Sequence, residues 1–169
     1  MVISGALATP AAGTTVVLWR NLAGQTSFHQ YSQTTTDSSG KYTFTLRRGV
    51  VLADQQYYVT ANGSRSATAT QEVDALVGLA ASARSTVVGH AIVLHGHVTP
   101  SHAGEVVLIE LRRGSTWHVI ARAKLTHGSN FATSHSFAQS GTDQLRVVLR
   151  ADSRNLQSVS PTLRVSVKA

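Results

Sequence analysis

The chain has 169 residues, a formal net charge of +7 at pH 7 and no cysteine. Without cysteine it can form neither a disulfide framework nor a cysteine–zinc site. No stretch approaches the roughly 20 consecutive apolar residues of a membrane-spanning helix, so we expect no membrane span.

Alternation of apolar and polar residues runs through the chain, and helical periodicity is almost absent. Glycine, serine, asparagine, aspartate and proline separate the alternating runs, as in 37–40, which is typical of turns between strands. In chain order, we predict strands at 2–7, 14–20, 27–36, 41–47, 56–61, 67–73, 76–83, 86–88, 91–98, 105–112, 116–125, 130–137, 144–150 and 160–168.

The sequence repeats itself with an offset near 90 residues. The matched pairs are Gly5 with Gly96, Pro10 with Pro100, Gly13 with Gly104, Val16–Leu18 with Val106–Leu108, and Phe28-His29 with Trp117-His118. A repeat of that length is a whole domain. We therefore predict two domains, 1–73 and 74–169. They are joined by little more than Asp74-Ala75, so we expect a stiff, elongated pair.

Seven or so short strands in each copy predict an all-β fold of two tandem Ig-like antiparallel β-sandwiches. Copy two has a leading stretch, Leu76 to Ala91, for which copy one has no counterpart before Val2. The first sandwich is therefore expected to lack its opening strand. An unpaired edge near residues 2–7 favours association or the docking of a donated strand, so we expect that the chain can self-associate through this edge.

Alternation also assigns side chains to the two faces of each strand. It puts Ile92, Leu94 and Val98 in the core, and it puts Trp117 and Tyr42 there as well. Leu18 and Trp19 are adjacent, so one of them must face outward, and Tyr57 and Tyr58 pose the same question.

Over about 74–168 the second copy carries a series of short motifs: Val88-Gly89, 94–100, Gly104, 106–113, Trp117, 145–147 and 160–165. In these motifs the chain resembles the bacterial Ig-like repeats of secreted actinobacterial proteins. In the first copy, 34–44 is similar to the Thr-Asp-x-x-Gly-x-Tyr-x-Phe hairpin of carboxypeptidase-regulatory-like and collagen-adhesin B-type domains. The resemblance implies a non-catalytic module repeated along an extracellular or cell-surface bacterial protein.

Chemistry-bearing patterns are sparse. There is no G-x-S-x-G elbow, P-loop or dinucleotide fingerprint, and the eight carboxylates are scattered. We predict no enzymatic activity and no cofactor. His95 and His97 alternate on one strand and could supply two ligands to a zinc ion, with solvated histidines on an outer face as the alternative.

Candidate ligand-binding residues are aromatic or basic. Exposed rings near an arginine suit carbohydrate, and paired arginines near strand ends suit an anionic polymer. These candidates are Trp19, Arg20, Tyr57, Tyr58, Arg47, Arg48, Arg112 and Arg113. The basic surplus is uneven, because residues 1–73 carry five basic and three acidic side chains whereas 74–169 carry ten and five.

Three functions remain open from the sequence. The first is a spacer or adhesion module whose partners are neighbouring Ig-like domains of the same parent chain and an anionic cell-wall polymer or polysaccharide. The second is a carbohydrate-binding accessory module of a polysaccharide-acting enzyme. The third is a fibre subunit that exchanges strands between chains. We expect an extracellular or cell-surface location, and no dense basic cluster favours nucleic acid.

Overall fold

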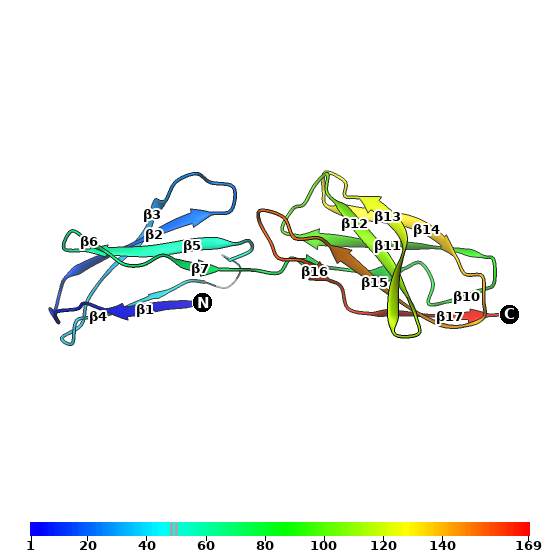
Figure 1. Cartoon of the computed structure of the whole chain (residues 1–169), viewed down its shortest axis with the longest axis horizontal. Helices are drawn as coiled ribbons and strands as arrows, with labels where there is room; N and C mark the ends of the chain where they lie inside the picture. The colour runs from blue at the N-terminus through cyan, green and yellow to red at the C-terminus, as the bar shows by residue number, and fades with distance from the viewer. Residues whose placement is uncertain (48, 50) are drawn as a thin grey trace. The chain divides into compact units, whose positions relative to one another are not determined.

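The structure, a computed structural model, describes all residues except 48 and 50. The chain separates into two compact units, Met1–Val73 and Asp74–Ala169 (Figure 1). The described residues of both units form strands, turns and loops and no helix. The predicted fold class is confirmed: the units are Ig-like antiparallel β-sandwiches, and the first has no counterpart of the opening strands of the second.

The described residues of the first unit form seven strands. They are β1 (Val2–Ala6), β2 (Thr15–Leu22), β3 (His29–Thr35), β4 (Lys41–Thr45), β5 (Gln55–Ala61), β6 (Ser64–Arg65) and β7 (Ala69–Gln71). β1 pairs with β4 in one sheet, and the order β3-β2-β5 forms the other sheet, in which β6 and β7 both pair with β5. Between the sheets lies a small core of Val16, Leu18, Phe44, Leu46, Tyr57 and Val59.

The second unit contains ten strands. They are β8 (Leu76–Val77), β9 (Ala80–Ala81), β10 (Ser85–Val87), β11 (Ala91–Thr99), β12 (Val106–Arg113), β13 (Thr116–Lys124), β14 (Asn130–Ser136), β15 (Gly141–Leu149), β16 (Ser158–Val159) and β17 (Leu163–Lys168). One sheet has β11 between β14 and the short strands β8 and β9, and the other runs β10-β17-β15-β12-β13. The β10–β17 pair is parallel, whereas the other strand pairs of this unit are antiparallel.

Turn chemistry sets the hairpins. In the predicted turn at 37–40, the Asp37 carboxylate accepts hydrogen bonds from the backbone N–H groups of Ser39 and Lys41, at 2.8 and 3.0 Å. These bonds lower the pKa of Asp37. Gly40 has a φ of +74°, and a Cβ there would lie 2.8 Å from the Pro10 Cα, so only glycine fits this turn.

Both units carry a β-bulge at the same place. The β2–β3 register shifts between Leu18 and Trp19, and the β12–β13 register shifts between Ile109 and Glu110. Each shift inserts one extra residue in the facing strand, which reverses the alternation beyond it. The common bulge makes Trp19 the counterpart of Glu110.

The bulge corrects one predicted face. Alternation placed Trp117 in the core. In the structure Ala121 and Ala123 pack against the core, but Val119 is 44% exposed and Trp117 lies half-buried on the outer face. The prediction for Trp117 is wrong because the extra residue, Ile120, shifts the pattern by one.

The structure also shifts one stretch of the repeat by a residue. Gly13 and Gly104 donate equivalent backbone bonds, to the carbonyls of Thr36 and Leu125. Counting onward from these glycines aligns Val16 with Val107, not with Val106 as the sequence match had it. Burial agrees, since Val16 and Val107 are fully buried whereas Val106 is 43% exposed.

Candidate functional site

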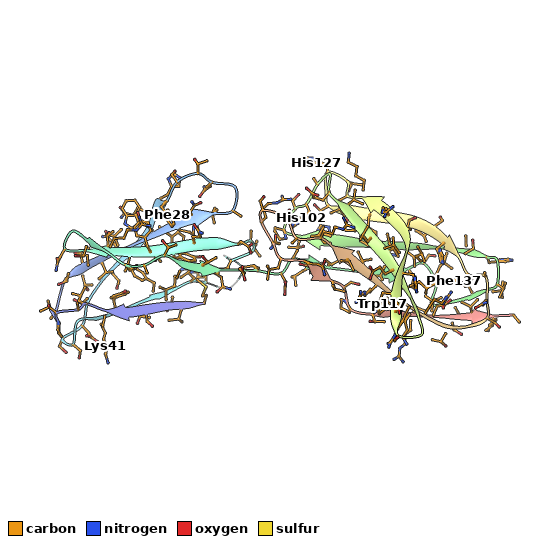
Figure 2. All side chains as sticks on the ribbon, viewed as in Figure 1. Phe28, Lys41, His102, Trp117, His127 and Phe137 are labelled. Carbon is orange, nitrogen blue, oxygen red and sulfur yellow. The ribbon has the colours of Figure 1, made fainter. Side chains whose placement is uncertain are left out.

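Three aromatic side chains meet on the outer face of the first unit: Trp19 on β2, Tyr58 on β5 and Phe28 just before β3. We call these residues, with Arg65 of β6, the outer aromatic cluster. Figure 2 labels Phe28. The rings of Trp19 and Tyr58 stack with centroids 5.9 Å apart and planes 14° apart. Phe28 meets Tyr58 at 4.7 Å with a tilt of 56°. Alternation along β2 sends Leu18 into the core and Trp19 outward, where it lies opposite Tyr58 of β5.

A cation covers part of this cluster. The guanidinium carbon of Arg65 lies 3.8 Å from the Tyr58 ring centroid and 5.7 Å from that of Phe28. The Trp19 indole N–H donates to the Thr60 hydroxyl at 3.0 Å. The rings are therefore held in place by stacking and a cation–π contact, and each remains partly open to solvent.

The other two predicted aromatic-face residues point away from the cluster. Tyr57 is only 3% exposed, and its hydroxyl donates to the Gln55 side-chain carbonyl at 2.5 Å. Burial raises the pKa of Tyr57. Arg20 stacks on Tyr31, with 4.0 Å from its guanidinium carbon to the ring centroid. Trp19 and Arg20 therefore do not share a face, and the arginine beside the outer rings is Arg65.

The second unit places a charged cluster at the corresponding position. The Arg146 Nε donates to Glu110 Oε2 at 2.7 Å, and its guanidinium carbon lies 4.3 Å from the Trp117 ring centroid. Glu110, Arg146 and Trp117 are the counterparts of Trp19, Tyr58 and Phe28. Sequence reasoning missed Phe28 and Arg65, although the repeat match of Phe28 with Trp117 was a signal that both share an environment.

The predicted paired arginines differ in how far the structure describes them and in their contacts. Arg47 is exposed after β4, and Arg48 lies outside the described residues. Arg112 and Arg113 end β12, where the Arg112 Nε donates to the Gly114 carbonyl at 3.0 Å and Arg113 forms an ion pair with Asp143. The second pair is thus engaged by groups of its own unit.

The predicted metal ligands His95 and His97 are both exposed on β11. His97 Nδ1 lies 3.1 Å from the Asn130 side-chain oxygen. Across the described part of the chain, no group of three or more histidine, aspartate or glutamate side chains is placed to hold a metal ion. The two histidines therefore have no third described protein ligand.

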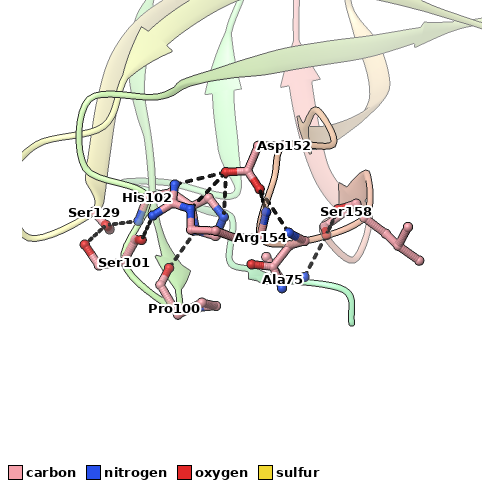
Figure 3. A network of polar contacts seen from close by, with 10 residues as sticks. Ala75, Pro100, Ser101, His102, Ser129, Asp152, Arg154 and Ser158 are labelled. Carbon is pink, nitrogen blue, oxygen red and sulfur yellow. Dashed lines mark hydrogen bonds and ion pairs between the residues drawn. The ribbon is translucent and has the colours of Figure 1, made fainter. Parts of the chain in front are cut away.

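A buried polar network lies at the loop end of the second unit (Figure 3). His102 is fully buried, its Nδ1–H donates to the Pro100 carbonyl at 2.7 Å, and its Nε2 lies 3.5 Å from Asp152 Oδ2. Arg154 bonds to Asp152 at 2.9 Å and to the Ser101 carbonyl at 2.8 Å. The network ties the loop after β11 to the loop after β15, which is a structural role that the sequence did not reveal.

Ionisation of Asp152 is part of this network. Burial works against the charged form, but hydrogen bonds from the Arg154 backbone and guanidinium and from the Asn155 backbone N–H outweigh it. The pKa of Asp152 is therefore lowered.

The chain matches no protein-family model and no curated protein. Solved structures do match. A tetra-tandem repeat in the extending region of a large adhesion protein is 14% identical with a TM-score of 0.51, covering 99% of this chain and 45% of that one. The Yersinia pseudotuberculosis adhesin InvE is 13% identical with a TM-score of 0.43, covering 99% and 54%. Invasin, a bacterial integrin-binding protein, is 17% identical with a TM-score of 0.41, covering 98% and 35%.

The match to the tetra-tandem repeat shows a likeness of fold, and this chain spans less than half of the length of that structure. Separately, the described residues form no helix long and apolar enough to cross a membrane.

Proposed function

We propose that this chain is a non-catalytic pair of Ig-like modules in an extracellular or cell-surface bacterial protein, where it acts as a spacer for adhesion. Its mechanism is geometric: each sandwich adds length, and a short connection limits how far neighbouring modules can pivot. Tandem copies of one fold suit this task because length grows with copy number.

The observation that carries the proposal is the anchoring of the connection. The Val73 backbone N–H donates to Asp54 Oδ1 of the first unit at 2.7 Å. Two residues later, the Ala75 backbone N–H donates to the Ser158 hydroxyl of the second unit at 2.8 Å. Asp74, between them, pairs with Leu156 in a single parallel bridge. These bonds leave few backbone torsions free within the connection itself.

The comparison with the tetra-tandem repeat supports the same idea, because that structure comes from a region described as extending a large adhesion protein. The likeness is one of fold, so the spacing role rests on the anchored connection of this chain.

Small-angle scattering with sedimentation tests the proposal. The matched control inserts Gly-Ser-Gly-Ser between Asp74 and Ala75, which leaves both sandwiches unchanged but separates the two anchors. We expect the native chain to scatter as a stiff, elongated monomer and the insertion to add clear flexibility. Equal flexibility in the two chains would contradict the spacer mechanism.

Attachment to an anionic cell-wall polymer or polysaccharide is a second part of the proposal. It is supported by the +7 charge of the chain and by the exposed Arg47. Dextran sulfate, with neutral dextran as control, is a suitable probe. Binding that weakens steeply with salt is expected, and equal retention of both polymers would exclude a charge-based contact.

The outer aromatic cluster favours the alternative of a carbohydrate-binding module. Its half-exposed rings offer a stacking surface beside an arginine, which suits sugar faces. A panel of soluble glycans should then quench the fluorescence of Trp19, and the quenching should vanish in Trp19→Ala but persist in Trp117→Ala. No quenching across the panel would remove this alternative.

A further inference from the structure

One edge of the first unit is unpaired in the described part of the chain. β1 pairs with β4 on one side, in a register from Val2 opposite Thr45 to Ala6 opposite Lys41. The Leu46 backbone N–H donates to the Met1 carbonyl at 2.9 Å, and the Leu7 backbone N–H donates to the Gly40 carbonyl at 3.0 Å. The backbone N–H and C=O groups of the odd-numbered residues of β1 therefore point toward β4. Because backbone groups alternate in direction along a strand, those of Val2, Ser4 and Ala6 point away from β4, toward the open edge.

The second unit fills the equivalent edge with its own opening segment. The counterparts of Val2, Ser4 and Ala6 are Val93, His95 and His97. Gly78 N–H donates to the His97 carbonyl at 2.9 Å, and Ser82 N–H donates to the Val93 carbonyl at 2.8 Å. Between them, β9 pairs Ala80 with His95. The second unit thus shows how this edge is paired when an opening segment occupies it.

Beside the open edge lies a groove of about 260 Å³. Its lining is mostly apolar, with Ser64, Arg65 and Ser66 as the polar part, and the apolar residues are Ala6, Leu7, Ala8, Val16, Tyr42, Val59 and Ala61. In the second unit the counterparts Val98, Phe131 and Leu149 are at most 3% exposed and belong to one buried cluster with Val77 of β8. In the first unit Leu7, Tyr42 and Ala61 are only half-buried. The groove therefore corresponds to the space that Val77 and its neighbours fill in the second unit.

A glycine occupies the same position of this edge strand in both units. A Cβ on Gly96 would lie 2.1 Å from the Gly78 carbonyl oxygen of the opening segment and 2.6 Å from the Phe131 ring. Gly5 is the counterpart of Gly96 and is covered by the Tyr42 ring instead. The first unit thus keeps the small residue that allows a backbone to approach closely.

We propose that the β1 edge and its groove accept an extended polypeptide segment that runs antiparallel to β1 and carries a small aliphatic side chain at every second position. The second unit defines this chemistry, because the inward side chains of its opening segment alternate. They are Ala75, Val77, Leu79, Ala81 and Ala83. Backbone hydrogen bonds supply affinity in such strand addition, and the alternate side chains supply selectivity.

The occupant is a segment from outside the described chain rather than a second copy. In a second copy, residues of this pattern already lie in the core of its own second unit, with Ala75 5% and Val77 6% exposed. If a second copy inserted these residues into the groove, it would expose the core of its own second unit, so the two molecules together would bury no additional apolar surface. The inference stands apart from the proposed spacer role, since an edge can accept a strand whether or not the modules act as a spacer.

The test uses the full chain and a synthetic peptide with the sequence of residues 74–87. Amide hydrogen exchange is followed by NMR at Ser4 and Ala6, with Ile3 and Gly5 as internal references that already face β4. We expect saturating peptide to slow exchange at Ser4 by at least about tenfold and to leave the reference amides little changed. No slowing at millimolar peptide would overturn the proposal.

Two control peptides distinguish strand addition from nonspecific association. A peptide N-methylated at the residue equivalent to Ala80 cannot donate the central backbone bond, and a peptide with serine at the positions of Val77 and Leu79 cannot fill the groove. Both should fail to protect Ser4. In the protein, Ser4→Pro has no amide at position 4 and should abolish the protection of Ala6, whereas Ser4→Ala should keep the protection of both amides. The peptide controls decide the matter if Ser4→Pro unfolds the unit. Equal protection by the control peptides, or self-association that the native peptide does not reverse, would contradict the proposed occupant.

Discussion

Trp19 of the first unit and Glu110 of the second occupy the same position, the first residue beyond a shared β-bulge. One stacks on Tyr58 and the other forms an ion pair with Arg146, which are themselves counterparts. The two units therefore share a backbone device and differ in the side-chain chemistry that it displays on the outer face. The outer faces are where the units are expected to differ in function.

Replacing Tyr58 tests the outer aromatic cluster as a source of stability. Tyr58→Ala removes contacts with Trp19, Phe28 and Arg65, and we expect the free energy of unfolding of the first unit to fall by about 1–3 kcal/mol. Urea unfolding followed by Trp19 fluorescence in a Trp117→Phe background measures it. The control is Gln56→Ala, an exposed residue of the same strand. Similar losses in the two variants would show that the cluster adds nothing.

The two matched glycines should respond differently to alanine. In Gly96→Ala the new Cβ would meet a backbone carbonyl at 2.1 Å, so we expect a loss of about 1–3 kcal/mol in the second unit. In Gly5→Ala the nearest atom is the Tyr42 hydroxyl, at the end of a movable side chain, so the loss in the first unit should be smaller. Calorimetry of the two variants makes the comparison, and a larger loss in Gly5→Ala would be inconsistent with these close approaches.

Protonation of Asp152 is expected to account for part of the loss of stability of the second unit in acid. Its pKa in the folded unit is lowered below the ordinary value of 3.8, so its contribution to stability is present above that value and is lost as the pH falls through the folded pKa. Asp152→Asn should therefore be less stable than the native chain near neutral pH, and the gap should narrow below about pH 4. Unfolding curves across this range measure the gap, with Glu72→Gln as an exposed control. A gap that does not change with pH would rule out this role.

Thr36 is predicted to support the loop between β1 and β2. Its hydroxyl donates to the Ala11 carbonyl at 2.5 Å and accepts from the Thr14 backbone N–H at 3.0 Å. Thr36→Val keeps the shape but leaves both groups without this partner, so we expect a loss of about 1–3 kcal/mol. Thr35→Val, at an exposed neighbour, should have little effect. Thermal unfolding of both variants distinguishes the two positions.

Much of the fold could be predicted because alternation and turn chemistry are local. The turn at 37–40, the alternating core residues of β11 and the strand order along the chain all follow from short patterns. Two of the four two-residue strands, β6 and β16, escaped prediction, because a two-residue pairing by itself leaves no periodic signal.

The candidate site was less predictable, because a β-bulge is not visible in the alternation that it interrupts. The sequence could say that one of Leu18 and Trp19 faces outward, but not which, and it placed Trp117 on the wrong face. Arg65 joins the cluster through the β5–β6 hairpin, where Asn62 and Gly63 have φ values of +49° and +75°. A side chain brought in by a tight turn lies outside any single-strand pattern.

The distance between one point in each module tests the spacer account most directly. The chain has no cysteine, so Ser39→Cys and Ser115→Cys, two exposed turn positions, accept one spin label in each unit. Pulsed electron resonance should give one narrow distance distribution in this chain and a broad one after Gly-Ser-Gly-Ser is inserted between Asp74 and Ala75. A native distribution as broad as that of the insertion would contradict the account.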